Sequence, residues 1–370
     1  MGVITPDYRI YGMISYRLMQ EGERLTRAPD RILNCTVFLG VKMAGDDEPK
    51  IGATAFILSE PFDLSYNMVH MYLVTATHNL IDAKKFSDDG LLYIRSNRKD
   101  STSSWMSSEF SKWYAHPDTD LSILPLFADK TEESIRSEKP LSDDPKEFDI
   151  NHIPVVMIAS PEVIEKEGIG VGDEVMAVGL FSEHPGTNQN IPLVRSGIIA
   201  SMLHEPIYLD GFDGYSEAYL IEMRSIGGFS GSPVFVYLGG SPNFLTVGQS
   251  SKFRLYERLT EFRPGTFYLL GLIHGHWDIQ EDHETYTKKE KAKKGIGTGI
   301  APVIPASKIF DLLQTEEMKT MREEHEKKHL KKNAPIPDTG FKDGLTKKEF
   351  EKTLKKVSEP TPPDEGTKGT

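Results

Sequence analysis

The sequence predicts an all-β protein. Short apolar segments rich in β-branched and aromatic residues alternate with turn segments that contain Gly, Pro, Asp or Asn over most of the chain. Short strands with regular turns favour antiparallel barrels over the alternating strands and helices of a parallel α/β sheet. The chain has 370 residues, of which 38% are hydrophobic, and this is enough for a sizeable packed core.

The expected strands fall into two groups. The first group comprises residues 35–41, 52–58, 69–76, 91–96 and 121–126. Residues 129–148 are rich in Glu, Lys, Ser, Asp and Pro, so they suit an exposed connection. The second group comprises residues 175–178, 194–201, 218–224, 233–237, 266–273 and 297–302.

The two ends of the chain differ from this strand-rich region. Residues 1–30 form a mixed, charged N-terminal segment. A helix is expected over 308–313 with Ser307 as its N-cap, and the densely charged residues 316–332 are expected to continue as a solvated helix. Residues 346–349 resemble a capping box for a further short helix, and the Pro-rich residues 359–366 are expected to be disordered.

Three segments carry residues suited to nucleophilic catalysis. Residues 227–235 read Gly-Gly-Phe-Ser-Gly-Ser-Pro-Val-Phe, which places Ser230 in a glycine turn before a strand. His78 follows the apolar strand 69–76, and Asp120 precedes the apolar segment 121–126. A serine hydroxyl needs an adjacent base to become a nucleophile. The three residues supply a base, an orienting carboxylate and a nucleophile, in the chain order His, Asp, Ser.

These segments resemble the trypsin-like serine peptidases. The family hallmarks are Thr-Ala-x-His, Asp-(Leu/Ile)-x-(Leu/Ile/Val)-Leu and Gly-x-Ser-Gly-Gly-Pro, which residues 75–78, 120–124 and 228–233 resemble in turn. Residues 172–179 look like the strand that opens the second barrel in bacterial HtrA-type peptidases, although no PDZ domain is evident. The likeness is therefore to cysteine-poor bacterial members without that domain.

The resemblance, over residues 31–313, implies a chymotrypsin-like fold of two six-stranded antiparallel β-barrels with a C-terminal helical extension. The first barrel would span residues 31–128 and the second 150–305, and residues 314–370 would form the charged extension and tail. The resemblance implies a serine endopeptidase in which Ser230 is the nucleophile, His78 the general base and acid, and Asp120 the residue that orients His78. The backbone N–H groups of Gly228 and Ser230 would form the oxyanion hole.

The resemblance also suggests where a specificity pocket would lie. Arg224 stands six residues before Ser230, and His274 and His276 fall on the strand expected to line the same pocket. A cationic lining would favour an acidic substrate side chain. Alternatively, Arg224 points away and pairs with a surface carboxylate. Phe229 replaces the aspartate that receives the new N-terminus in trypsin-type zymogens, so activation of that kind is not expected.

Two other functions remain possible from the sequence. One is a catalytically silent relative that binds peptides or partner proteins, in which case the three residues would be a turn serine, a strand-end histidine and a capping aspartate. The other is an α/β-hydrolase. That fold requires Gly-x-Ser-x-Gly and places the acid and the histidine after the serine, whereas Ser232 occupies the last motif position here.

Composition narrows the choice of partner and compartment. The formal net charge of −12 argues against nonspecific nucleic-acid binding, and no apolar segment reaches the ~18 residues of a membrane span. The sequence indicates no cofactor and no metal site, because His274, His276 and His283 have no convincing fourth ligand nearby. Cys35 is the single cysteine and no secretory signal is evident, so we expect a cytoplasmic protein acting on peptide or protein substrates. A mature periplasmic form, whose start has been processed, is the alternative.

Overall fold

Strands dominate the chain, as its short apolar segments predict. The computed structural model describes residues 28–63, 68–126, 148–223, 228–238, 266–275 and 299–332. Residues up to His325 belong to one structural unit. The chain from Glu326 onward belongs to a second unit, of which only the end of one helix is described.

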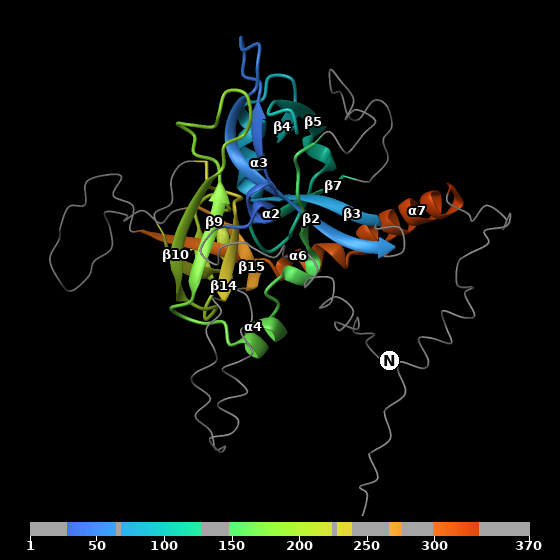
Figure 1. Cartoon of the computed structure of the whole chain (residues 1–370). Coiled ribbons are helices and arrows are strands. Elements are labelled where there is room, and N and C mark those ends of the chain that lie inside the picture. Colours follow the sequence, from blue (N-terminus) through green and yellow to red (C-terminus); the bar gives the residue numbers. More distant parts are fainter. Residues whose placement is uncertain are drawn as a thin grey trace, which may run out of the picture. The chain divides into compact units, whose positions relative to one another are not determined.

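The N-terminal strands form one eight-stranded sheet (Figure 1). Its order is β5-β4-β1-β2-β3-β7-β6, with β8 paired in parallel to β2 and every other pair antiparallel. The strands are β1 (Thr36–Val41), β2 (Lys50–Asp63), β3 (Met68–Thr75), β4 (Leu91–Asn97), β5 (Ser103–Glu109), β6 (Tyr114–Ala115), β7 (Ser122–Pro125) and β8 (Ile153–Pro154).

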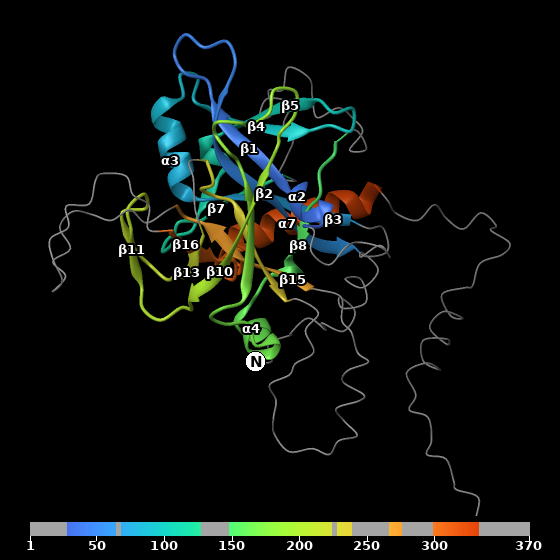
Figure 2. The same ribbon diagram turned by 60° about the vertical axis from the view of Figure 1, so that its left-hand side comes forward.

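The C-terminal strands form a closed six-stranded antiparallel barrel in the order β10-β13-β16-β15-β14-β9. Its strands are β9 (Glu174–Gly179), β10 (Leu193–Ser201), β13 (Tyr219–Glu222), β14 (Pro233–Leu238), β15 (Thr266–Ile273) and β16 (Ile300–Pro305). A hairpin of β11 (Ile207–Leu209) and β12 (Gly214–Ser216) lies between β10 and β13 in the chain, and Figure 2 shows β11 standing at the edge of the barrel.

The expectation of two six-stranded barrels is therefore met only for the second. The first sheet ends at β5 on one side and at β6 on the other, and no ladder joins these two strands in the described part of the chain. β6 has only two residues and pairs with β7 alone, so it offers little edge for closure. The topology is consistent with a chymotrypsin-like fold that has one closed and one open half.

Helices are few in the described part of the chain. They are α2 (Asp30–Leu33), α3 (Thr77–Phe86), α4 (Pro161–Glu167), α6 (Lys308–Leu313) and α7 (Glu316–Lys332), with 3-10 turns at Phe110–Lys112 and Val155–Met157. The expected helix over 308–313 is confirmed, although the Ser307 side chain makes no capping bond. No helix within the described ranges is long and apolar enough to cross a membrane.

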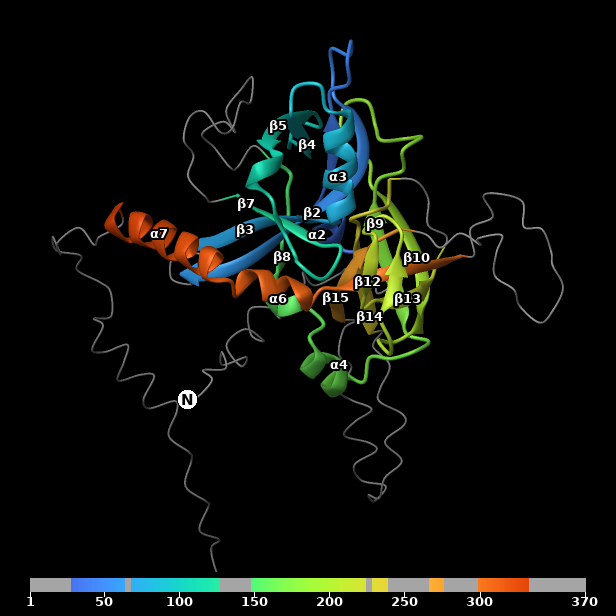
Figure 3. The same cartoon turned by 180° about the vertical axis from the view of Figure 1, so that it is seen from behind.

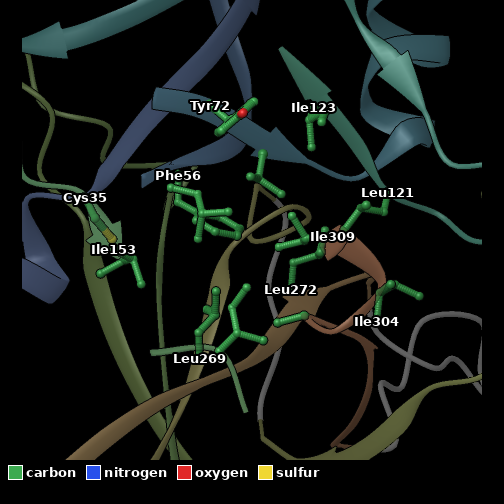
Figure 4. Close-up of a cluster of buried hydrophobic side chains, with 14 of the residues drawn as sticks. Cys35, Phe56, Tyr72, Leu121, Ile123, Ile153, Leu269, Leu272, Ile304 and Ile309 are labelled. Atoms are coloured by element: carbon green, nitrogen blue, oxygen red, sulfur yellow. The ribbon is translucent and has the colours of Figure 1, made fainter. Parts of the chain in front are cut away.

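An apolar core lies between the two halves, in addition to the cluster inside the barrel. Strands that contribute to both are buried on both faces, which explains why their sequences are almost continuously apolar. Successive residues of a strand point to opposite faces. On β14, Phe235 enters the core between the two halves, while Val234 and Val236 fill the inside of the barrel. Figure 4 shows Phe56 and Tyr72 from the first half in the shared core with Leu269, Leu272 and Ile304 from the second, and α6 adds Ile309.

The start of α7 belongs to this core. The charged composition of residues 316–332 predicts a solvated extension, yet Met318 is fully buried in the shared cluster. Arg322 lies 3.4 Å from Glu60 and 3.4 Å from the Tyr72 hydroxyl. The packed unit therefore continues past residue 313, the boundary expected from the sequence.

Candidate active site

His78 lies at the N-terminus of helix α3, which packs against β1 and β4 (Figures 1 and 3). Strand β3 ends at Thr75, Ala76 is extended, and His78 is the second residue of the helix. The first N–H groups of an α-helix have no partner within the helix. The His78 N–H donates to Asp120 Oδ1 over 2.9 Å. The Asp120 carboxylate thus caps the helix and holds the backbone of His78.

The His78 ring bridges Asp120 and Ser230. Its Nδ1 lies 2.6 Å from Asp120 Oδ2, and its Nε2 lies 2.5 Å from Ser230 Oγ. Because an ionised carboxylate can only accept, Nδ1 carries the proton and Nε2 presents its lone pair to the serine hydroxyl. The His78 side chain is 14% exposed, so solvent reaches it. The three residues singled out in the sequence therefore meet in hydrogen-bonding order.

The Asp120 carboxylate is fully buried, and it is ionised. Burial alone opposes the charge, but hydrogen bonds from the rings of His274 and His78 outweigh it and hold the pKa of Asp120 well below its usual range. His274 Nδ1 lies 2.5 Å from Oδ2, the oxygen that also accepts from His78. One carboxylate oxygen therefore serves two imidazole rings.

The Ser230 hydroxyl has two acceptors. Besides His78 Nε2, the carbonyl oxygen of His274 lies 2.8 Å from Ser230 Oγ. A hydroxyl has a single hydrogen, so the imidazole and the carbonyl compete for it. Only donation to the imidazole prepares the serine for proton transfer. His274 thus contacts both ends of the Ser–His–Asp chain, with its ring at Asp120 and its carbonyl at Ser230.

Residues from the first sheet hold the turn that carries Ser230. The Ser230 carbonyl accepts from the Thr54 N–H over 3.2 Å and from Asn79 Nδ2 over 3.1 Å. Thr54 Oγ1 donates to the Gly228 carbonyl over 2.8 Å and accepts from the Leu180 N–H over 2.9 Å. Because Thr54 belongs to β2 and Asn79 to α3, the turn that carries Ser230 is held across the junction of the two halves.

Two glycines give this turn its shape. Gly228 and Gly231 have φ of +92° and +83°, which L side chains rarely adopt. A Cβ on Gly231 would lie 2.2 Å from the Thr54 carbonyl oxygen, so the close approach of the turn to β2 requires a glycine. The next residue in the motif, Ser232, is buried, and its hydroxyl has no hydrogen-bond partner.

Two backbone N–H donors lie beside the Ser230 hydroxyl. The N–H groups of Gly228 and Ser230 donate no hydrogen bond to the part of the chain that the structure describes. Preorganised donors of this kind can stabilise a developing oxyanion. Between them, the Phe229 ring is fully buried in the barrel core, and the Arg195 guanidinium lies 5.9 Å from its centre. Apolar packing of Phe229 therefore anchors this turn.

The β11–β12 hairpin covers one face of His78. A Cβ on Gly211 would lie 3.1 Å from His78 Cγ, so a side chain here would press on the imidazole. Thr119 Oγ1 and Ser216 Oγ are 2.6 Å apart and buried, which ties the hairpin to the residue preceding Asp120. The hairpin is thus part of the surroundings of the candidate base.

The residues expected in the specificity pocket have different outcomes. Arg224 and His276 lie outside the described residues. His274 is described, and its ring is buried against Asp120, 154 positions away in the chain. This pairing, the Thr54 contacts and the covering hairpin could not be predicted from the sequence, because each joins segments that are distant along the chain. A histidine after an apolar strand was the one available signal for His274.

His78, Asp120 and His274 are also three potential metal ligands within the described residues. Two ring nitrogens lie 2.6 and 2.5 Å from the same Asp120 oxygen. Ligand atoms around a tetrahedral zinc ion are about 3.3 Å apart, given metal–ligand bonds of about 2.0 Å. The arrangement therefore suits two hydrogen bonds better than a shared ion.

No family model matches the sequence, and no curated protein matches it. Among solved structures, the chain is similar to the apo protease domain of MamO from Magnetospirillum magneticum, with 13% identity, a TM-score of 0.40, and coverage of 77% of this chain and 98% of that one. It is also similar to a serine endoprotease from Yersinia pestis, with 13% identity, a TM-score of 0.36, and coverage of 80% and 67%. Deg5 gives 15% identity, a TM-score of 0.33, and coverage of 55% and 74%. Likenesses this distant add nothing to the functional argument.

Proposed function

We propose that this protein is a trypsin-like serine endopeptidase that hydrolyses peptide bonds through His78, Asp120 and Ser230. The observation that carries the proposal is the continuous chain of hydrogen bonds from Ser230 Oγ through the His78 ring to the buried Asp120 carboxylate. The lowered pKa of Asp120 supports an ionised carboxylate that accepts from His78 Nδ1, and Nε2 is then the ring atom that can take the Ser230 proton.

In the proposed reaction Ser230 Oγ attacks the carbonyl carbon of the scissile bond while His78 Nε2 takes the hydroxyl proton. Asp120 stabilises the resulting imidazolium, and the N–H groups of Gly228 and Ser230 donate to the oxyanion. His78 then returns the proton to the leaving amine as the C–N bond breaks, which leaves an acyl group on Ser230. Water then attacks the acyl carbon while His78 Nε2 takes one of its protons. The bond from that carbon to Ser230 Oγ breaks, His78 gives the proton to Oγ, and the acid leaves.

A latent form of the same site is the second candidate. The His274 carbonyl can accept the hydrogen bond of the Ser230 hydroxyl in place of His78 Nε2, which leaves the serine without an activating base. A site held in that state would bind peptides without cleaving them. Labelling of the serine distinguishes the two, since only an activated hydroxyl reacts with a phosphonylating reagent.

The test is labelling with a fluorophosphonate, followed by mass-spectrometric mapping of the modified residue. We expect modification at Ser230, its loss in Ser230→Ala and His78→Ala, and a fall in peptide hydrolysis of at least about 1,000-fold in both variants. Ser232→Ala is the matched control, because that serine stands two positions away with a buried, unbonded hydroxyl. Labelling that persists in Ser230→Ala, or wild-type protein that is never labelled at Ser230, contradicts the proposal.

Substrate and compartment belong to the proposal as well. The substrate class is peptide or protein, and an acidic residue before the scissile bond would suit the position of Arg224 in the sequence. The cytoplasmic location expected from the single cysteine stays a prediction. Cys35 itself is buried, and burial raises the pKa of its thiol well above the usual value, so it is an unreactive core residue.

A further inference from the structure

We propose that His274 is a positioning residue of this site, whose ring shares the Asp120 carboxylate with His78 and so limits how much negative charge reaches the His78 imidazolium. The inference rests on the proposed function, which gives the His78 imidazolium its importance. The sequence motifs do not include His274, and the sequence placed it in a specificity pocket. The inference instead gives it a part in the proton transfer itself.

The ring of His274 contacts both Asp120 and His78. Both Nδ1 atoms lie within 2.6 Å of the same oxygen, Asp120 Oδ2. The two rings meet edge to face with their centres 4.9 Å apart. The His274 N–H donates to the Pro302 carbonyl over 3.0 Å, so strand β16 fixes the backbone from which the ring projects. The side chain is only 10% exposed, which leaves little room for the ring to turn away.

In the described part of the chain, two ionisable residues contact the His274 ring. Asp120, from the loop before β7, bonds to it, and the His78 ring, from α3, meets it edge to face. The backbone that carries the ring follows β15, which ends at Ile273, and bonds to Pro302 of β16. Among the described residues, the ring therefore faces one carboxylate and one other imidazole.

A neutral His274 and a charged one act differently on His78. As a neutral donor, His274 satisfies one lone pair of a buried carboxylate and withdraws part of its charge from the His78 side. As a cation, it would neutralise Asp120 and place a positive charge 4.9 Å from the ring that must become positive during catalysis. As long as His274 is a neutral donor, its hydrogen bond therefore sets how much of the Asp120 charge acts on the His78 ring.

Two variants separate the hydrogen bond from the charge. In His274→Asn, the side-chain amide can place an N–H near the position of Nδ1 but cannot ionise. In His274→Ala, the donor is lost. We expect His274→Ala to lower kcat about 10-fold, with KM changed less than about twofold, because Asp120 loses one of the two ring donors that hold its carboxylate in place against His78. The whole carboxylate charge would then favour the protonated His78 ring, so the acid limb of kcat/KM would move to higher pH by about one unit.

His274→Asn should keep kcat within about threefold and leave the acid limb close to that of the wild type, since the donor is retained. Equal losses of kcat in both variants with an unmoved acid limb would show a purely structural role and overturn the inference. Wild-type kcat and pH profile in His274→Ala would overturn it as well.

Proton NMR of the resting protein supplies a readout that needs no turnover. Two ring N–H protons bound to one carboxylate should give two strongly downfield signals, and both variants should lose one of them. Retention of both signals in His274→Ala contradicts the inference. If fluorophosphonate never labels Ser230 while one signal is lost as expected, the proposed function fails and the shared carboxylate stands.

Discussion

Thr54→Val tests whether the first sheet holds the turn at residues 228–231, which carries Ser230, in the conformation that the proposed reaction needs. The Thr54 hydroxyl donates to the Gly228 carbonyl over 2.8 Å and accepts from the Leu180 N–H over 2.9 Å. Valine has nearly the same shape but neither donates nor accepts, so both backbone groups lose a partner. Thr54 and Leu180 are fully buried, and water cannot replace the hydroxyl without opening the junction between the two halves.

The size of the effect follows from those two groups. A buried N–H left without a partner costs about 1–3 kcal/mol, and the half-exposed Gly228 carbonyl loses a bond worth about 1 kcal/mol. The free energy of unfolding should therefore fall by ~3 kcal/mol, which lowers Tm by roughly 5–10 °C in a domain of this size. Because Gly228 also supplies a proposed oxyanion donor, kcat should fall about 10- to 100-fold, less than for outright loss of the donor.

The assays are thermal unfolding and steady-state peptide hydrolysis. Thr54→Ser is the matched control, since it keeps the hydroxyl and removes one buried methyl group, at a cost of about 1 kcal/mol. We expect near-normal kcat in that control. Should Thr54→Val unfold within about 1 °C of the wild type and retain its kcat, the hydroxyl would not organise the turn, and the reasoning would be refuted.

Two further predictions concern the base and the pH dependence of stability. Gly211→Val should lower kcat by at least about 10-fold while the fold persists, because the glycine is exposed and its Cβ would press on His78. An unchanged kcat would show that the hairpin moves away without displacing the His78 ring, which would contradict the prediction. Burial, helped by the charge of Arg31, lowers the pKa of His152, so the folded protein takes up this proton at lower pH than the unfolded chain. The free energy of unfolding should therefore decline as pH falls below about 6.5, and His152→Asn should reduce that decline in urea titrations at pH 7.5, 6 and 5. An identical decline in the variant would assign it to other groups.

Local patterns were sufficient for most elements of the fold. The strands around Phe56, Tyr72 and Phe235 could be predicted because their residues are buried on both faces, which leaves an apolar segment between turns. β5 could not be predicted from its sequence, Ser-Ser-Trp-Met-Ser-Ser-Glu, which has the composition of a loop. This segment is a strand because it pairs along its whole length with β4. Helix α3 was missed because its amphipathic pattern is weak, while the tertiary cap from Asp120 supports its first turn.

The sequence by itself determined which residues could perform the chemistry, because His78, Asp120 and Ser230 stand in motifs read from a few neighbouring positions. Only the tertiary structure decided which groups hold them there. The bonds from His274 to Asp120 and from Thr54 to Gly228 join residues 154 and 174 positions apart. Such contacts depend on how the two sheets pack against each other. The relative orientation of two sheets produces no periodic pattern of residues along the chain, so it cannot be predicted from local sequence. The fold was likewise readable as all-β, whereas the closure of one sheet and the opening of the other depended on which edge strands found partners.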